Sequence, residues 1–159
     1  GESKVNDLPF AAATQFKVDD DELYVSQNAK HKVQIGGGDK KCKLTITVPY
    51  GTVLDEMEIG IDVGAVEISG FDIKEGKIST EVGAVNLDKV DFDNLKIDTD
   101  VGAVGVKLLN DIKDYTINLS TDVGAVEVGG ANYKRSYNQN GATNKTLKIN
   151  TDVGAISIK

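Results

Sequence analysis

Five near-copies of one four-residue unit run through this chain from residue 62 to residue 155, and they constrain its fold more than any other feature. Each unit reads acidic residue, Val, Gly, Ala, and we number the copies one to five in chain order. The units lie at 62–65, 81–84, 100–103, 122–125 and 152–155, so successive copies start 19, 19, 22 and 30 residues apart. Such a period is typical of stacked-repeat proteins, which act through their surface more often than through a buried cleft.

Residues on either side of each unit alternate between apolar and polar, which predicts β-strands. Aligned copies carry a large apolar residue three positions before the acid and, from copy two onward, Thr one position before it. Side chains at alternate positions of a strand share one side, so we expect these residues and the Val after the acid to point inward. We also expect the threonine hydroxyls to hydrogen-bond along the stack. This threonine ladder consists of Thr80, Thr99, Thr121 and Thr151.

The inward parity changes after each Gly-Ala pair, which predicts a corner at that point. Glycine tolerates positive φ, and little more than alanine fits inside a tight bend. The expected structural corner consists of Gly64, Gly83, Gly102, Gly124 and Gly154. Beyond the corner, the inward positions are predicted to be Val66, Val85, Val104, Val126 and Ile156.

Two all-β folds satisfy this pattern. In a single-stranded β-solenoid (β-helix), each repeat is one coil of about 19–22 residues and equivalent residues stack in ladders. In a β-meander, each Val-Gly-Ala-Val is a hairpin turn. We favour the solenoid, because a hairpin needs a turn former but not the same apolar residue at many equivalent positions.

The remaining chain is predicted to complete a single β-domain over residues 16–159. Residues 1–15 lack periodicity and are expected to form a flexible lead-in. Alternation around Leu23, Val33 and Leu44 predicts further strands, and no segment holds a helical apolar period. The single cysteine, Cys42, excludes an internal disulfide and is interpreted as a core residue.

Charge and hydropathy exclude several classes of function. The net charge of −7 argues against binding to nucleic acid or to anionic lipid. No apolar run is long enough for a membrane span. The chain opens at Gly1 without Met, so we expect a targeting or anchoring segment upstream in the natural protein.

With these features in place, the chain resembles the bacterial DUF4097 family, adhesin-type proteins built from β-strand repeats. The resemblance covers about residues 16–159 and is carried by the strand Leu44-Thr45-Ile46-Thr47-Val48-Pro49, the segment Leu54–Ile59 and the repeated Ile-x-Thr-x-x-Gly-x-Val units. The family commonly has Ser or Asp before that Gly, whereas this chain has Val. The resemblance implies a β-helical, extracytoplasmic or membrane-associated domain, and it brings no catalytic residues.

Acidic residues offer the main candidates for metal binding. Stacked carboxylates at Asp62, Glu81, Asp100, Asp122 and Asp152 could attract Ca²⁺, but their parity predicts that they point into solvent and splay apart. Asp19-Asp20-Asp21-Glu22 is interpreted as a solvated turn. His31 has no second His or Cys partner for zinc. We therefore expect no bound metal and no cofactor.

An enzyme acting on polysaccharide would need two neighbouring carboxylates on one sheet. The outward positions five residues after the ladder acid hold Glu67 and Glu127, with Asn, Gly and Ser in the copies between them and after them. Three coils would separate these two acids by about 14 Å, too far for a glycosidase pair. The sequence therefore predicts no catalytic residues.

The long interval between copies four and five, at 131–141, is the expected binding surface. It combines tyrosine with amide and hydroxyl residues, a mixture used by adaptable binding loops. The candidate binding residues are Asn132, Tyr133, Arg135, Tyr137, Asn138 and Gln139. Alternatively, the segment is a hairpin that covers the open edge expected beside copy five, an edge that could also form a homodimer.

These observations favour a non-enzymatic binding or structural module at the cell surface, with an envelope protein or glycan as partner. A domain for envelope-stress sensing or regulation, which contacts another protein, is the alternative. A β-helical enzyme acting on polysaccharide is a third interpretation.

Overall fold

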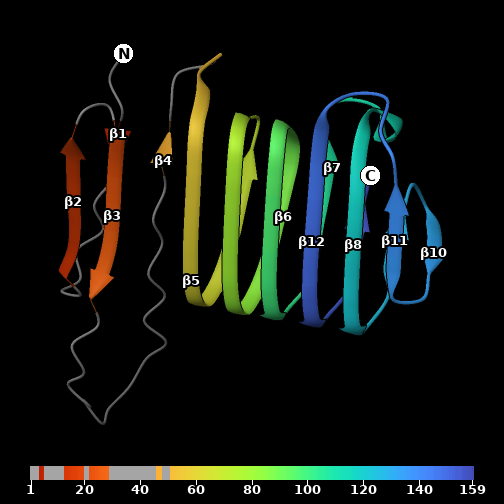
Figure 1. Ribbon diagram of the computed structural model, residues 1–159. Helices are drawn as coiled ribbons and strands as arrows, with labels where there is room; N and C mark the ends of the chain where they lie inside the picture. Colours follow the sequence, from red (N-terminus) through yellow and green to blue (C-terminus); the bar gives the residue numbers. More distant parts are fainter. Residues whose placement is uncertain (1–3, 6–12, 20–21, 29–45, 48–50) are drawn as a thin grey trace, which may run out of the picture. The chain divides into compact units, whose positions relative to one another are not determined.

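The computed structural model describes residues 4–5, 13–19, 22–28, 46–47 and 51–159. Cα proximity divides the chain into two compact units, Gly1–Pro49 and Tyr50–Lys159, and each is described by itself (Figure 1). Cys42 and His31 lie outside the described residues. In the described part of the chain, no helix is long and apolar enough to cross a membrane.

In the first unit, the described residues form two antiparallel strand pairs. β1 (Lys4–Val5) pairs with β4 (Ile46–Thr47), and β2 (Ala13–Asp19) pairs with β3 (Glu22–Asn28). The register of the second pair runs to Asp19 opposite Glu22, at the predicted acidic turn. Strands β1 and β2 place regular structure inside the predicted lead-in.

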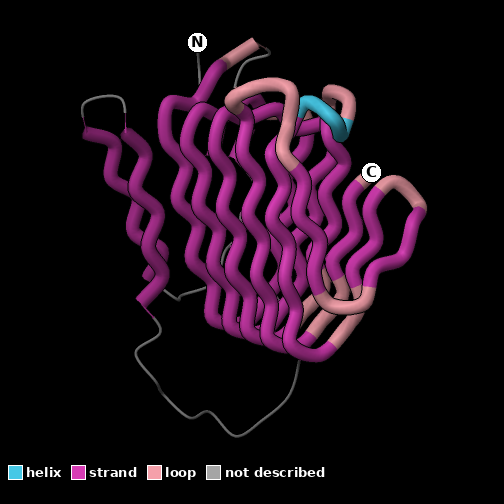
Figure 2. Tube along the Cα trace, turned by 45° about the vertical axis from the view of Figure 1, so that its right-hand side comes forward, coloured by secondary structure: helices cyan, strands magenta, loops and turns pink. Residues whose placement is uncertain are grey.

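The second unit is all-β apart from one 3₁₀ turn, η1 (Ile112–Asp114), which confirms the all-β part of the predicted fold class. Nine strands form one sheet that continues around the corner from one layer to the other (Figure 2). They are β5 (Val53–Ser69), β6 (Asp72–Val101), β7 (Val104–Leu108), β8 (Tyr115–Val123), β9 (Val126–Val128), β10 (Ala131–Tyr133), β11 (Ser136–Gln139), β12 (Lys145–Val153) and β13 (Ile156–Ile158).

Equivalent residues of the repeat lie side by side in parallel register. Ile59 of copy one is opposite Ile78 of copy two, and Gly64 is opposite Gly83. The Gly-Ala pairs are therefore paired bends and not hairpin tips, so the meander is wrong for these residues. A shift of one whole repeat keeps every inward position inward, which explains why such a register is stable.

The order of the copies in space differs from their order in the sequence. β12 of copy five pairs with β6 of copy three on one side and with β8 of copy four on the other. β13 likewise lies between β7 and β9. In Figure 1 the blue β12 stands between the green β6 and the teal β8. The stack therefore runs one, two, three, five, four.

This order corrects the expected position of the open edge. Copy five is an interior strand, so it leaves no edge to be covered. Copy four is at the end of the stack, and β10 and β11 pair with its strands β9 and β8 in antiparallel register. The long interval before copy five gives the chain enough length to form both covering strands and then return to the gap beside copy three.

The core is the inward ladder on both sides of the corner. Among the buried residues are Ile78, Val85, Phe92, Ile97, Val104, Leu119, Val126, Ile149 and Ile156. Thr80, Thr99, Thr121 and Thr151 are also buried, as predicted.

The threonine hydroxyls follow the predicted hydrogen-bonding pattern only in part. Thr80 Oγ1 donates to Thr99 Oγ1 at 2.8 Å, which is the expected bond along the stack. Thr121 Oγ1 instead donates to the carbonyl of Gly154 at 3.0 Å. Within the described residues, Thr151 Oγ1 is buried without a partner.

The valine of each unit points outward, and its predicted inward position is wrong. The exposed fraction ranges from 45% at Val153 to 77% at Val63. In the register of β5 and β6, Ile61 pairs with Thr80 and Val63 pairs with Val82, but the acids between them are not paired. The bend therefore begins at the acid, two residues before the glycine where it was expected, and it turns the valine into solvent.

Close backbone approach explains why the corner requires glycine. A Cβ atom on Gly102 would lie 1.5 Å from the carbonyl oxygen of Gly83, and one on Gly83 would lie 1.6 Å from that of Gly64. The same holds for Gly154 against Gly102 and for Gly124 against Gly154. Apart from Gly64, which is first in the stack, each corner glycine thus packs directly on the backbone of the preceding copy in the stack. This close approach, rather than a positive φ, is what these positions share.

Candidate functional site

A shallow polar hollow of about 200 Å³ lies near the capped end of the stack. It is formed where β12, β8 and β11 lie next to one another, since Asn150 is opposite Ser120 and Ser120 is opposite Ser136. These strands expose amide and hydroxyl groups at alternate, outward positions. The residues that line the hollow are Asn118, Leu119, Ser120, Ser136, Asn138 and Asn150.

A chain of hydrogen bonds fixes one side of the hollow. Ser120 Oγ donates to Asn150 Oδ1 at 3.0 Å, and Asn150 Nδ2 donates to Asp98 Oδ1 at 2.8 Å. Lys96 Nζ lies 2.7 Å from Asp98 Oδ2. Burial alone would raise the pKa of Asp98, but hydrogen bonds from Lys96 and Asn150 outweigh it and lower that pKa. Asp98 therefore remains an ionised acceptor that orients the Asn150 amide.

The other polar side chains of the hollow are available to a ligand. In the part of the chain that the structure describes, the side chains of Asn118, Ser136 and Asn138 have no hydrogen-bond partner. Amides and hydroxyls offer both donors and acceptors at short reach. Such a lining suits a ligand rich in hydroxyl groups, and it presents no carboxylate of its own.

Only one of the six candidate binding residues of the 131–141 segment lies in this hollow, namely Asn138. Tyr137 and Gln139 point the other way, as alternation requires. Tyr137 Oη donates to Gln139 Oε1 at 2.6 Å, and Gln139 Nε2 donates to the carbonyls of Ile112 and Tyr115 at 2.7 and 3.0 Å. These two residues hold the covering strand against copy four.

The other three candidates lie outside the hollow. Asn132 is exposed on β10, opposite Glu127. The ring of Tyr133 packs on that of Tyr137, with 4.6 Å between centroids. Arg135 is exposed, and its carbonyl accepts a hydrogen bond from the Thr121 amide at 2.8 Å.

Sequence reasoning missed Asn118, Ser120 and Asn150. A signal was present for Asn118, because at four positions before the acid copies one to three all carry a charged residue, whereas copy four carries Asn118. The order of the copies was needed to bring Asn150 beside Ser120.

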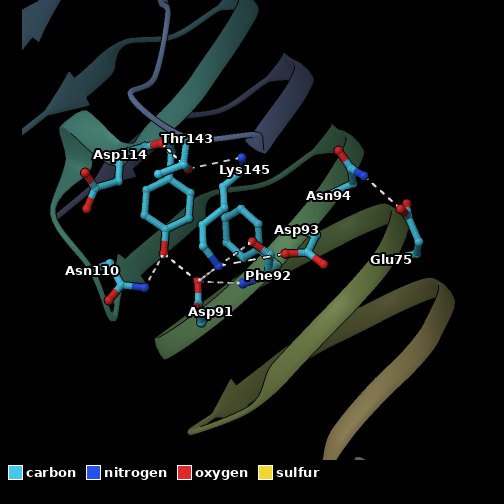
Figure 3. Close-up of polar contacts among 10 residues, drawn as sticks. Glu75, Asp91, Phe92, Asp93, Asn94, Asn110, Asp114, Thr143 and Lys145 are labelled. Carbon is cyan, nitrogen blue, oxygen red and sulfur yellow. Dashed lines mark hydrogen bonds and ion pairs between the residues drawn. The ribbon is translucent and has the colours of Figure 1, made fainter.

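A second polar cluster lies where β8 and β12 begin, beside Asp91 of β6, and it joins three copies (Figure 3). Asp91 Oδ1 accepts hydrogen bonds from Tyr115 Oη at 2.8 Å, from Lys145 Nζ at 2.8 Å and from the Phe92 amide at 2.9 Å. Asn110 Nδ2 donates to Tyr115 Oη at 3.3 Å. The rings of Phe92 and Tyr115 pack with centroids 5.1 Å apart.

The ionisation of this cluster is fixed by its surroundings. Burial alone would raise the pKa of Asp91, but hydrogen bonds from Lys145 and Tyr115 outweigh it and lower that pKa. Burial, with the Asp91 carboxylate adding to it, raises the pKa of Tyr115 to about 12 despite the hydrogen bond from Asn110. The Asp91 carboxylate therefore accepts hydrogen bonds from both the Tyr115 phenol and Lys145 Nζ, an arrangement that suits a structural link better than proton transfer.

The residues of the predicted acidic ladder are all exposed. Among the described residues, no group of three or more His, Cys, Asp or Glu side chains is arranged to hold a metal ion. The ladder acids make no hydrogen bond or ion pair within that part of the chain. The structure thus leaves this row of carboxylates free at the corner.

Comparison with known proteins gives one result. The sequence profile of the family described as Toastrack DUF4097 matches residues 10–108, which is more than half of the chain. This range extends across both units and ends with the last residue of β7, after copy three. No curated protein and no solved structure gives a significant match.

Proposed function

We propose, from the premise that the chain belongs to the Toastrack DUF4097 family, that it is a non-enzymatic binding and structural module. In this proposal, the stacked repeats form a rigid support and the polar hollow binds hydroxyl groups of a neutral glycan. The cell surface or another extracytoplasmic, membrane-associated position is the proposed location, consistent with an adhesin.

The hollow is the observation that carries this proposal. Asn150 is held in one orientation by Ser120 and Asp98, while Asn118 and Asn138 retain free amides. Oriented groups lose little freedom on binding, so a preorganised lining of this kind supports recognition. A shallow, open site on a sheet suits a residue of a long polymer better than an enclosed small molecule.

Catalysis on polysaccharide receives less support from the same geometry. A glycosidase needs two carboxyl groups about 5–9.5 Å apart, one of them with a raised pKa. Asp98, the carboxylate next to the hollow, has a lowered pKa and is bonded to Lys96 and Asn150. A protein-binding role in envelope-stress sensing or regulation is the second proposal, and the exposed valines at the corner favour it.

We also propose that the second unit is a single-stranded β-solenoid with coils of about 19–22 residues. Parallel pairing of equivalent residues and the close stacking of corner glycines support this interpretation. In a Cys42→Ser background, cysteines at Val101 and Val153 should form a disulfide on oxidation, since these residues are paired. Cysteines at Val101 and Val123 lie two strand spacings apart, about 9.6 Å, and should not.

A glycan array with matched variants tests the binding proposal. Wild-type protein should retain a hydroxyl-rich glycan, and Asn138→Ala should reduce retention about tenfold, which corresponds to about 1.4 kcal/mol. Asn86→Ala is the control, because Asn86 is an exposed amide on the other side of the corner. Equal loss in both variants, or no retained glycan with wild-type protein, would contradict the proposal.

We also propose that two copies of the chain can form a homodimer through an open sheet edge. Analytical ultracentrifugation over a range of protein concentrations tests it directly, and a concentration-independent monomer would contradict it.

A further inference from the structure

The corner of the stack carries two parallel rows of exposed side chains, which we call the valine–carboxylate ridge. One row is apolar and the adjoining row is acidic. In the order of the stack, the ridge consists of Val63, Val82, Val101, Val153 and Val123 with Asp62, Glu81, Asp100, Asp152 and Asp122. Every valine is at least 45% exposed. Contiguous exposed apolar side chains with a polar border are typical of interaction sites.

Equivalent residues of the five copies occupy the same structural position, so a residue type that occurs in all five indicates a shared requirement. Outward positions on the strands that lead to the corner vary between copies. Four residues before the acid they hold Glu58, Lys77, Lys96, Asn118 and Lys148, and two residues before it Gly60, Ser79, Asp98, Ser120 and Asn150. The ridge positions do not vary in this way: valine occurs in all five copies, and an acid precedes it each time.

Folding alone does not account for this uniformity. The glycine is required by close approach and the threonine is buried, but an exposed strand position accepts Thr, Ile or Tyr as readily as Val. Asp is disfavoured in strands, and neighbouring carboxylates about 4.8 Å apart repel by about 1 kcal/mol even in water. The ridge therefore keeps a destabilising row of charge at the same place in each copy.

We infer that the valine–carboxylate ridge docks a basic amphipathic segment of another polypeptide, with apolar side chains on the valines and Lys or Arg on the carboxylates. Charge complementarity argues for this occupant, because the ladder acids have no cationic partner within the described residues. Four strand spacings give a ridge about 19 Å long, which matches about 13 residues of helix. A second copy is disfavoured, since two acidic rows would face each other.

This inference does not depend on the glycan proposal, because the ridge and the hollow share no residue. The test uses the full chain and a fluorescein-labelled, 14-residue helical peptide (about four turns) of Leu and Lys with one apolar stripe. Fluorescence anisotropy gives the Kd at about 0.05 M and about 0.3 M salt, conditions that differ in charge screening.

Three variants separate the contributions of the two rows. The first replaces all five ridge valines by Thr, which keeps shape and strand propensity. The second replaces the five ridge acids by their amides. The third is the matched control and removes five charges elsewhere: Glu56→Gln, Glu67→Gln, Asp72→Asn, Asp114→Asn and Glu127→Gln.

We expect the valine and acid variants each to weaken peptide binding at least about tenfold and the control to weaken it less than about twofold. Circular dichroism confirms folding. If a fivefold variant does not fold, Val101→Thr and Asp100→Asn at the centre of the ridge should each weaken binding about twofold. Equal loss in the control would show general attraction to net charge and overturn the inference. Unchanged binding by the threonine variant, absence of binding by wild-type protein, or a wild-type dimer that the threonine variant dissociates would also overturn it.

Discussion

Copies one to three of the repeat follow one another in space as they do in the sequence, whereas copy five lies between copies three and four. Both regions use the same ladders, so the inward pattern defines which side faces the core but not which copy is the neighbour. In copies three to five, the choice of neighbouring copy therefore depends on residues that are not repeated from copy to copy. Asp91, Tyr115 and Lys145 come from copies three, four and five, and their shared hydrogen bonds link these copies in the observed order.

The largest effect should come from the feature that both regions share, the close packing of corner glycines. Gly102→Ala should destabilise the protein by about 4 kcal/mol or more, because the new Cβ would lie 1.5 Å from the Gly83 carbonyl oxygen. Gly60→Ala is the control, because its new Cβ would lie 3.6 Å from its nearest contact in a regular strand, and it should be neutral or slightly stabilising. Urea unfolding measures both, and equal stabilities would show that the stack can open at the corner.

The next effect should be confined to the region with the altered order. Asp91→Ala removes the acceptor of Lys145 and Tyr115, which are largely buried, and should cost about 2–3 kcal/mol. Asp88→Ala is the matched control, since its ion pair with Lys107 is exposed and should contribute less than about 1 kcal/mol. If thermal unfolding gives both variants the same stability, the cluster does not select the order.

The phenol of Tyr115 should make the same region sensitive to alkali. Its folded pKa of about 12 is above the unfolded value of about 10, so the stability that it contributes is present below pH 10 and is lost as pH rises toward 12. Tyr115→Phe should remove this alkaline loss and cost about 1 kcal/mol at neutral pH. Tyr133→Phe, a change at an exposed ring, should leave the pH profile unchanged. Stability measured from pH 8 to 12 decides between these outcomes.

The smallest effect should distinguish two members of the threonine ladder. Thr99→Val leaves the hydroxyl of Thr80 without its acceptor and should cost about 1 kcal/mol. Thr151→Val removes a buried hydroxyl that has no partner in the described structure, so it should be neutral or slightly stabilising. Denaturation of both variants under one set of conditions provides the comparison, and a larger loss at Thr151 would contradict it.

The sequence allowed the all-β class, the repeat and the buried threonines to be predicted, because ladders of identical residues record a shared environment directly. The valine row was assigned to the wrong side, since periodicity cannot locate the residue at which a bend begins. The order of the copies was not predictable either. Repeats with the same inward pattern can stack in any order, so Asn150 and Ser120 could not be expected to meet at one hollow. Within the 131–141 segment, Asn138 and Gln139 could not be told apart until β11 fixed their alternation.

The interior position of copy five has a consequence for how the protein is made. During synthesis, residues of copy four emerge before the strand that must separate them from copy three. Until Lys145–Val153 emerges, β6 and β8 each lack the partner that completes their hydrogen bonding. Completion of the stack therefore waits for a strand far along the chain, and pairing over such a distance is slow. A repeat array usually folds by adding one unit at a time to its neighbour in the sequence. In this array the last strand pair in the sequence must insert between copies three and four before the sheet is complete.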